Sequence, residues 1–580
     1  MTARPERSGP VPPWVEAPPP AGSWRSLFKW GDPGTAKHPG PGLVRLLKEA
    51  FGLDDEAFRR PRRPGLDPAR AGRPPALAAG ARADLEAMLG PENVRTDDHS
   101  RLAAAYGKGM LDLLRLRRGI AEHLPDAVLH PRDRHDLVRI VDYCSRHGIA
   151  MTARGAASSV VRGIECPAGG VSLDLRTHMD RILAFNEVRQ TVTVQPGLYG
   201  PRLEGHLNQA PEAFGAARRY TCGHFPQSFE HSTVGGWAAT RGAGQGSTYY
   251  GKIEDLVLAQ EYVTPAGVIR TGEHPAAATG PDTDQILLGS EGAFGVLAEA
   301  TLRVFRWLPG NRRRFSYLFR DWDAALDAAR EILQGQFGNP TVFRLSDPAE
   351  TDAALRQYGL DRPVTEALLG LLGLAPGARC LLLGTAEGER RFARNVARQV
   401  GRICRSRGAV PTTGLVTRAW EHGRFRDPYL RDDLQDFGIL TDTLECAVTW
   451  DGLERVRRGV RAYCAARPRT LCLTHLSHGY PQGASLYFIF LTTLDDIEQY
   501  RSFQGGLLDV ILREGAAMSH HHGIGRLAAP WMEDHLGSAQ MDLFRAIKRH
   551  LDPKGLMNPG GTLGLDLPRA APGTRSADSP

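Results

Sequence analysis

The segment that decides the fold is CGHFPQSFEHSTVGGWAATRGAGQGSTYYGKIEDLV, residues 222–257. Glycine-rich turns flank WAATRGAG, and a further glycine-terminated loop leads into a strand-like run. Glycine lets the backbone approach a bound molecule closely, and His224, Ser228, Thr233 and Thr240 place polar groups among the glycines. Such a stretch is typical of a loop that wraps a flat ring system with polar edges.

Two further glycine-containing turns lie on either side of this segment. ARGAASSVVRGIECP, residues 153–167, combines small residues with serine hydroxyls, so its backbone N–H groups can approach a diphosphate. On its own this stretch is a weak signal, and an ordinary tight turn accounts for it more readily. LLGSEGAFGVLAEATLRV, residues 287–304, is a glycine turn that feeds a strand.

Bulk composition excludes several classes of protein. With 580 residues the chain is too long for a single core and suits two or three domains. The net charge is +7, but the basic residues are interleaved with acidic ones along the whole chain, so a nucleic-acid-binding face is not expected. The Cys residues show no Cys-x-x-Cys spacing, which disfavours a zinc or disulfide framework.

The pattern along the chain predicts an α+β fold with several regions. Strand-like runs in the first half are short and punctuated by Gly or Pro, and a strand–helix–strand pattern recurs in the second half. That pattern predicts an antiparallel sheet covered by helices on one face. The expected limits are 1–24 for a disordered tail, 25–90 for a helical segment and linker, 91–308 and 309–525 for two domains, 526–565 for a closing segment, and 566–580 for a tail.

These motifs resemble a known family. GHFPQSFEHSTVGGWAATR, YGKIEDLV, VTPAGVI and GSEGAFGV resemble the alkylglycerone-phosphate (alkyl-dihydroxyacetone-phosphate) synthase family of the vanillyl-alcohol-oxidase type FAD-linked oxidases. AWEHGRFRDPYLRD, SHGYPQGASLYFIF, SHHHGIG and LDPKGLMNPG are similar to its bacterial branch. The resemblance implies a two-domain FAD-linked oxidase fold. Residues 91–308 and 526–565 would form the FAD-binding domain of two α+β subdomains, and residues 309–525 an antiparallel-sheet cap that binds substrate.

The resemblance also implies which residues bind FAD. They are Arg154, Gly155, Ala156, Ala157, Ser158 and Ser159 in the diphosphate loop; His224, Pro226, Gln227, Ser228, Thr233, Gly236, Thr240 and Gly244 beside the flavin; and Glu291, Gly292 and Val296, which complete the pocket. No His occupies the loop position where covalent members of the superfamily attach the cofactor. FAD is therefore expected to bind non-covalently.

By the same resemblance the catalytic groups lie in the cap. They are Tyr487, His520, His521, His522, His475 and Arg344. Tyr487 would be the acid/base that handles a substrate proton, a role for which a phenol needs burial near positive charge. The three consecutive histidines are expected to follow a short strand, where alternate side chains point to opposite faces. They would then not converge on one ion, and no metal site is predicted.

Two departures from the family pattern concern binding. The family's diphosphate loop has three glycines, whereas Gly155 is followed here by Ala156 and Ala157; at a positive φ each Ala would cost about 1 kcal/mol. Arg162 replaces a small residue and is expected to compensate by pairing with phosphate. His475 stands where animal synthases have an arginine, and is a weaker, pH-dependent partner for an anion.

Three functions follow from these observations. A synthase-like enzyme would exchange the acyl group of an acyl-glycerone phosphate for a long-chain alcohol, a step of ether lipid synthesis. A rival is an FAD-dependent 2-hydroxy-acid dehydrogenase acting on a lactate- or glycolate-like substrate. A third is a non-catalytic binding protein with a weakened FAD site, motivated by Ala156 and Ala157.

The expected partner is a small or lipid-like substrate. Peripheral membrane contact and a homodimer are left open. Residues 1–22 lack an apolar signal-peptide core, and no apolar run approaches the roughly 20 residues of a membrane helix. The final ADSP is not a peroxisomal address. We therefore expect a cytoplasmic protein.

Overall fold

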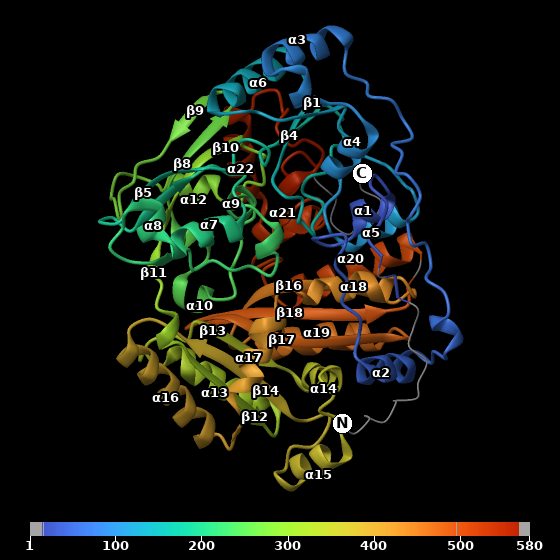
Figure 1. The fold of residues 1–580 in the computed structure, drawn as a ribbon, viewed down its shortest axis with the longest axis vertical. Coiled ribbons are helices and arrows are strands. Elements are labelled where there is room, and N and C mark those ends of the chain that lie inside the picture. The colour runs from blue at the N-terminus through green and yellow to red at the C-terminus, as the bar shows by residue number, and fades with distance from the viewer. Residues whose placement is uncertain (1–13, 16, 495, 568–580) are drawn as a thin grey trace.

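The computed structural model describes residues 14–15, 17–494 and 496–567, and Figure 1 shows their arrangement. A four-stranded sheet has the order β1-β2-β4-β3. Its strands are β1 (Val94–Arg95), β2 (Ala127–Leu129), β4 (Val171–Asp174) and β3 (Met151–Arg154). β2, β4 and β3 run parallel, so α6 (Arg134–His147) connects β2 to β3 as a crossover helix.

A five-stranded antiparallel sheet lies beside the first, in the upper half of Figure 1. Its order is β5 (Ile182–Asn186), β6 (Thr191–Val194), β10 (Val296–Arg303), β8 (Val257–Thr264) and β9 (Gly267–Arg270). A small ribbon pairs β7 (Tyr220–Thr221) with β11 (Phe305–Arg306). The helices of this region are α7 (Gly200–Asn208), α8 (Ala210–Phe214), α9 (Val234–Ala239), α10 (Ser247–Tyr250), α11 (Ile253–Leu256) and α12 (Thr283–Leu287).

The lower half of Figure 1 contains a seven-stranded sheet whose strand pairs are all antiparallel. Its order is β15 (Val410–Pro411), β12 (Arg313–Phe319), β14 (Cys380–Ala386), β13 (Val342–Ser346), β17 (Thr470–Tyr480), β18 (Gly483–Thr492) and β16 (Leu440–Thr449). One face packs into the main core under α13 (Trp322–Gln334), α16 (Arg390–Ser406), α19 (Leu453–Ala465) and α20 (Ile497–Arg513). The predicted antiparallel cap sheet is confirmed, and with it the α+β fold.

The opposite face of this sheet is covered too, which the sequence pattern did not predict. The elements on this side are α2 (Pro41–Phe51), α14 (Pro348–Gln357), α17 (Gly414–Gly423) and α18 (Asp427–Gln435). α15 (Pro363–Leu371) projects at the lower end of the molecule (Figure 1). Because these helices do not fill the space above the strands, a cavity remains between them and the sheet.

The N-terminal segment packs against the cap. Arg25 and Lys29, in and just after α1 (Trp24–Phe28), form buried ion pairs with Asp436 and Asp433 at 2.9 and 3.3 Å. Part of the expected disordered tail is ordered, because Trp14 packs edge-on against Phe437 at 4.6 Å between ring centroids. Residues 1–13 of that tail lie outside the described residues. α3 (Ala79–Leu89), α4 (Asp98–Ala105) and α5 (Met110–Arg117) lead into the first sheet.

The closing segment returns to the first half of the chain. It contains α21 (Met532–Leu536) and α22 (Ser538–Leu551), and Met557 forms a parallel bridge with Met151 beside β3. Arg526 also donates to the carbonyl of Arg162 at 3.1 Å. The residue limits of the domains stay a prediction, and of the expected C-terminal tail only 566–567 are described.

Candidate active site

One cavity of about 790 Å³ connects the three glycine-containing turns with the face of the seven-stranded sheet that lies under α2, α14, α17 and α18. Most of the predicted site residues line it. They are Arg154, Gly155, Ala156, Ala157, Ser158, Ser159, Pro226, Gln227, Ser228, Thr233, Gly236, Thr240, Glu291, Gly292, Val296, Arg344, His475, Tyr487, His521 and His522. The cavity wall does not include His224, Gly244 or His520.

The three predicted residues outside the wall have other surroundings. His224 is buried behind the wall beside Trp237, with 4.7 Å between ring centroids, and burial lowers its pKa to about 3. Gly244 allows two chain segments to pack, because a Cβ there would lie 2.4 Å from the backbone nitrogen of Phe225. The Nε2 atom of His520 hydrogen-bonds to the hydroxyl of Tyr480 at 2.7 Å.

The diphosphate loop has positive φ at one of its two alanines. Ala157 has a φ of 57°, whereas Ala156 does not belong to the residues of positive φ. The expected strain therefore applies to Ala157 alone and amounts to about 1 kcal/mol. Gly155 is needed for close approach, since a Cβ there would lie 2.3 Å from the hydroxyl oxygen of Thr233.

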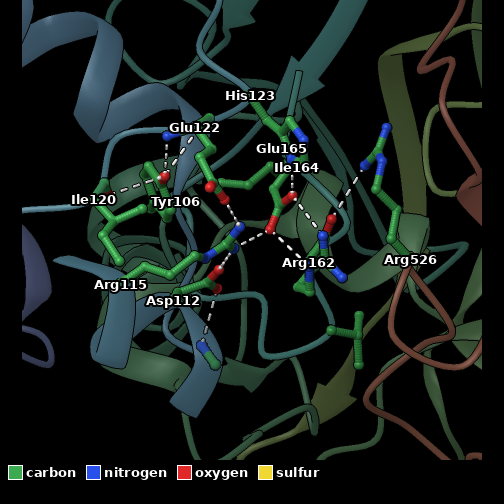
Figure 2. Close-up of polar contacts among 12 residues, drawn as sticks. Tyr106, Asp112, Arg115, Ile120, Glu122, His123, Arg162, Ile164, Glu165 and Arg526 are labelled. Atoms are coloured by element: carbon green, nitrogen blue, oxygen red, sulfur yellow. Dashed lines mark hydrogen bonds and ion pairs between the residues drawn. The ribbon is translucent and has the colours of Figure 1, made fainter. Parts of the chain in front are cut away.

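Arg162 is paired within the protein and does not line the cavity. Its Nε donates to Glu165 at 2.8 Å and its Nη2 at 3.0 Å, so the guanidinium pairs with a carboxylate. That it also pairs with phosphate stays a prediction. Figure 2 shows Glu165 between Arg162 and Arg115, with His123 donating or accepting at 2.7 Å on the other oxygen. Burial acts to raise the pKa of Glu165, but Arg115 and its other partners outweigh burial and hold the pKa well below the usual value.

Glu291 fastens the third turn to the segment after the histidines. Its carboxylate accepts hydrogen bonds from the backbone N–H groups of Ile524 and Gly525 at 2.6 and 2.7 Å. Its carbonyl accepts one from Asn558 at 2.7 Å. Burial raises the pKa of Glu291 to about 7. The third turn and the closing segment therefore form one wall of the cavity.

The register of the strands places two catalytic candidates of the cap, Tyr487 and His475, in one row across the sheet. Tyr487 of β18 lies opposite His475 of β17 on one side and Glu445 of β16 on the other. Directly opposed residues share a face of a sheet, so all three point toward the cavity side. The rings of Tyr487 and His475 stack, with 4.9 Å between centroids.

Tyr487 is buried without the excess of positive charge that its role was expected to need. The pKa of Tyr487 is raised to about 12, mainly by burial and also by the charges of Glu445 and Asp442, against the opposing effects of a hydrogen bond with Thr443 and the charge of Arg344. The phenol therefore holds its proton at neutral pH. His521 lies near it, and burial holds the pKa of that imidazole well below the usual value, so it is uncharged.

The three histidines lie in a loop of bends rather than after a strand, with only an isolated bridge between Ala517 and Ala447 before them. Glu445, which no pattern in the sequence indicated, holds this loop through its carboxylate. It accepts the backbone N–H groups of His520, His521 and His522 at 2.6, 3.1 and 2.9 Å and the hydroxyl of Ser519 at 2.6 Å.

This loop brings side chains together that a strand would separate. Ligand atoms of Glu445, His521 and His522 lie within 4.8 Å of one another, so the expected alternation of neighbouring side chains does not hold for His521 and His522, whereas His520 is not part of this group. The carboxylate already accepts four hydrogen bonds, which leaves it poorly available to a metal ion.

Glu350, a second residue that no pattern in the sequence indicated, joins two predicted ones. Its Oε1 accepts from Nη2 of Arg344 at 2.6 Å and hydrogen-bonds to Nδ1 of His475 at 3.0 Å. Burial lowers the pKa of His475, and the neighbouring Arg344 lowers it further. His475 is therefore an uncharged polar group in the cavity wall, and Arg344 carries the positive charge.

Arg431 is a third missed residue and faces the cavity from α18. Its Nη1 donates to the carbonyl of Lys108 at 2.6 Å and its Nε lies 3.7 Å from Oδ1 of Asp432, whereas Nη2 is buried and has no hydrogen bond among the described residues. Donors in this state favour an anionic ligand. The only signal in the sequence was the motif RDPYLRD, which carried the resemblance.

The far arm of the cavity is apolar. It runs between the sheet and the helices α2, α14, α17 and α18 and reaches Tyr358, Leu360 and Leu415, which are partly open to solvent. The residues along it are Leu43, Leu46, Leu47, Leu355, Leu381, Leu383, Leu430, Leu434, Leu471, Leu473, Ile489 and Leu491. Such a lining suits a long hydrocarbon chain.

The part of the cavity that lies between the three glycine-containing turns fits FAD. The three turns offer backbone groups and the serines of the diphosphate loop, and a Cβ at Gly236 would meet no atom within 3.4 Å, so that glycine borders open space. Comparison with protein families agrees. A model of the FAD binding domain matches residues 125–272, and a model of the C-terminal domain of FAD linked oxidases matches residues 308–562.

This chain belongs to the FAD-linked oxidases. FAD is its cofactor, and the chain is an FAD-dependent enzyme, which sets aside the hypothesis of a non-catalytic binding protein. That the FAD is bound non-covalently stays a prediction. No helix among the described residues has both the length and the apolar character needed to cross a membrane.

Among the FAD-linked oxidases, this one is similar to alkyldihydroxyacetonephosphate synthases. It is 28% identical to the Dictyostelium discoideum synthase over 82% of this chain and 79% of that protein. A solved structure of an alkyldihydroxyacetonephosphate synthase superposes with a TM-score of 0.77 at 25% identity, over 92% of this chain and 99% of the other. The resemblance to that family is confirmed, and membership of its bacterial branch stays a prediction. The glycolate oxidase subunit GlcD of Bacillus subtilis is 24% identical over 83% of this chain and 96% of that protein.

Proposed function

We propose that this FAD-linked oxidase exchanges the acyl group of an acyl-glycerone phosphate for a long-chain alcohol. The observation that carries the proposal is the continuity of one cavity from the FAD turns, past Tyr487, into an apolar arm. A small hydroxy acid would leave that arm unused, whereas an acyl or alkyl chain would fill it and displace water from apolar surface.

The residues of the chain suit the two ends of such a substrate. Arg431 and Arg344 supply fixed positive charge for the phosphate, and Nη2 of Arg431 has no hydrogen bond among the described residues. Arginine is suited to this contact because its planar group can donate two parallel hydrogen bonds to phosphate oxygens. The chain would extend from there along the leucines above the sheet.

Proton handling falls to the groups around Tyr487. Its phenol carries a proton at neutral pH, and the uncharged imidazole of His521 offers a proton acceptor beside it. Tyr487 would assist removal of the C1 proton of the glycerone and return a proton later. FAD, when bound, supplies a redox-active ring beside this carbon, and the exchange has no net redox change.

The experiment that tests the proposal uses the purified yellow holoenzyme. Palmitoyl-glycerone phosphate and labelled hexadecanol should give labelled alkylglycerone phosphate and free palmitate, without an electron acceptor and without bleaching of the flavin. Absence of exchange with this pair and with shorter and longer chains would refute it.

A 2-hydroxy-acid dehydrogenase is the second candidate, because of the similarity to the glycolate oxidase subunit GlcD. It predicts a different result in the same cuvette. Anaerobic lactate or glycolate would bleach the flavin, and the spectrum would return on addition of an electron acceptor.

The proposed substrate also implies contact with a membrane, where such chains reside. α15 has no buried residue, and Val364, Leu368 and Leu371 are 82%, 58% and 86% exposed. Tyr358 and Leu360, just before this helix, line the outer end of the apolar arm. An exposed apolar helix at the mouth of a chain-binding cavity fits the surface of a bilayer.

A further inference from the structure

A row of arginines covers the outer face of α16. The helix turns Ala393, Val396, Val400, Ile403 and Cys404 into the core. Its exposed arginines are Arg390, Arg391, Arg394, Arg398, Arg402 and Arg405, which we call the arginine stripe. Arg394, Arg398 and Arg402 are spaced four residues apart, so they form one line along the helix.

The charge of this stripe is not balanced by ion pairs within residues 14–15, 17–494 and 496–567. None of its six arginines forms an ion pair with an acidic side chain among the described residues. Arg398 and Arg402 donate only to the side-chain amides of Asn395 and Gln399, at 3.0 Å each. Arg407, one turn further on, shows the contrast, because it pairs with Glu331 of α13 at 3.1 Å.

The stripe lies at the same end of the molecule as the apolar helix α15. Both helices are in the lower part of Figure 1. Arg320 connects them: its Nε donates to the carbonyl of Leu372 just after α15 at 3.2 Å, and its Nη1 lies 3.9 Å from the position of a Cβ at Gly408 just after α16. An apolar element and a polybasic element are therefore neighbours.

We propose that the arginine stripe binds anionic lipid headgroups and so directs the molecule to negatively charged bilayers. The reason is that an apolar anchor alone gives marginal, reversible membrane binding, whereas a polybasic patch added to it gives stable binding. Each basic residue near an anionic surface strengthens partitioning by about fivefold. The inference extends the membrane contact proposed above, but the arginine stripe is a separate surface with its own test.

The test measures sedimentation of the full-length holoenzyme with vesicles that contain no substrate. Wild type should bind phosphatidylcholine vesicles that contain phosphatidylglycerol far more tightly than vesicles of phosphatidylcholine alone, and added salt should weaken this binding. The variant Arg394→Gln/Arg398→Gln/Arg402→Gln should lose on the order of a hundredfold in partitioning to the anionic vesicles.

Two further variants keep the result interpretable. Arg139→Gln/Arg146→Gln/Arg549→Gln removes the same charge from α6 and α22, away from the lower end of Figure 1, and should bind like wild type. Arg394→Lys/Arg398→Lys/Arg402→Lys keeps the charge and should retain most of the binding. Thermal melts check that all variants fold.

Three results would overturn the inference. They are no preference of wild type for anionic vesicles, equal losses in the stripe variant and the α6/α22 variant, and equally tight binding of a DNA duplex through the same arginines. Acyl exchange measured in neutral detergent micelles is a separate readout that the stripe variant should leave unchanged. Loss of the exchange reaction in wild type would therefore refute the proposed function without affecting the vesicle result.

Discussion

Glu350 and His475 share a hydrogen bond of 3.0 Å in the wall of the cavity, through Oε1 and Nδ1. The same oxygen accepts from Arg344 at 2.6 Å. Burial acts to raise the pKa of Glu350, but Arg344 and His475 outweigh burial and lower it to about 2. The carboxylate thus remains charged at any pH at which the protein works, and it fixes the orientation of both cavity-lining partners.

Replacing Glu350 by Gln tests this arrangement through the pH dependence of stability. A carboxylate whose pKa is depressed in the folded state stabilises that state above its unfolded pKa, and the effect is lost as pH falls through the folded pKa. Glu350→Gln should therefore lower the free energy of unfolding by on the order of 3 kcal/mol at pH 7 and by much less near pH 2. Urea denaturation of wild type and variant across this pH range measures the difference in the free energy of unfolding.

A surface pair provides the matched control for Glu350. Glu49 pairs with Arg356 at 2.9 Å but is 63% exposed. Glu49→Gln should change stability by no more than about 1 kcal/mol, because exposed ion pairs contribute little. Equal effects of Glu350→Gln at both ends of the pH range would contradict the depressed pKa of Glu350.

Removal of one hydroxyl tests the proton-handling role of Tyr487. Tyr487→Phe should reduce turnover of the exchange reaction by at least about a hundredfold, the usual contribution of a positioned acid or base. The flavin absorption spectrum and the content of FAD should remain as in wild type. Tyr317→Phe is the control, since Tyr317 lies on β12 of the same sheet and does not line the cavity. Full activity of Tyr487→Phe would end this assignment.

The three glycine-containing turns could be predicted from the sequence because they depend on local patterns, whereas Tyr487 and His475 of the cap followed from the family resemblance. Glycine-rich turns and alternating strands are encoded in consecutive residues. Glu445 and Glu350 could not be found in this way, because each acts across elements that are neighbours only in the folded sheet. The placement of His520 could not be predicted for another reason. The loop that carries it has no regular periodicity, so the sequence does not show which way its side chain points.

The two alanines of the diphosphate loop offer a matched pair. Ala157 has a positive φ of 57°, and Ala156 does not share it. Ala157→Gly should raise the free energy of unfolding by roughly 0.5–1 kcal/mol, because glycine adopts this region without strain. Ala156→Gly should lower it by a similar amount, since glycine there only adds freedom to the unfolded chain.

Thermal melts with and without added FAD measure the stability and the FAD binding of both alanine variants. Relief of strain in the loop should appear as tighter FAD binding in Ala157→Gly than in wild type. A stabilising Ala156→Gly together with a destabilising Ala157→Gly would reverse the assignment of strain within the loop.

Glu165 stabilises the diphosphate loop through its contacts with Arg162, Arg115 and His123 (Figure 2). Glu165→Gln would leave the half-buried guanidinium of Arg162 without its carboxylate and the buried guanidinium of Arg115 with Asp112 as its remaining buried partner, a change that costs about 3 kcal/mol. Because Arg162 belongs to the loop itself, FAD affinity should fall with stability, by at least about tenfold. Quenching of flavin fluorescence on binding measures the affinity.

Glu122, which lies 3.6 Å from Arg115 and is 51% exposed, is the control, and Glu122→Gln should change neither stability nor FAD affinity appreciably. Loss of stability with unchanged FAD affinity in Glu165→Gln would show that the network supports the fold but does not position the loop.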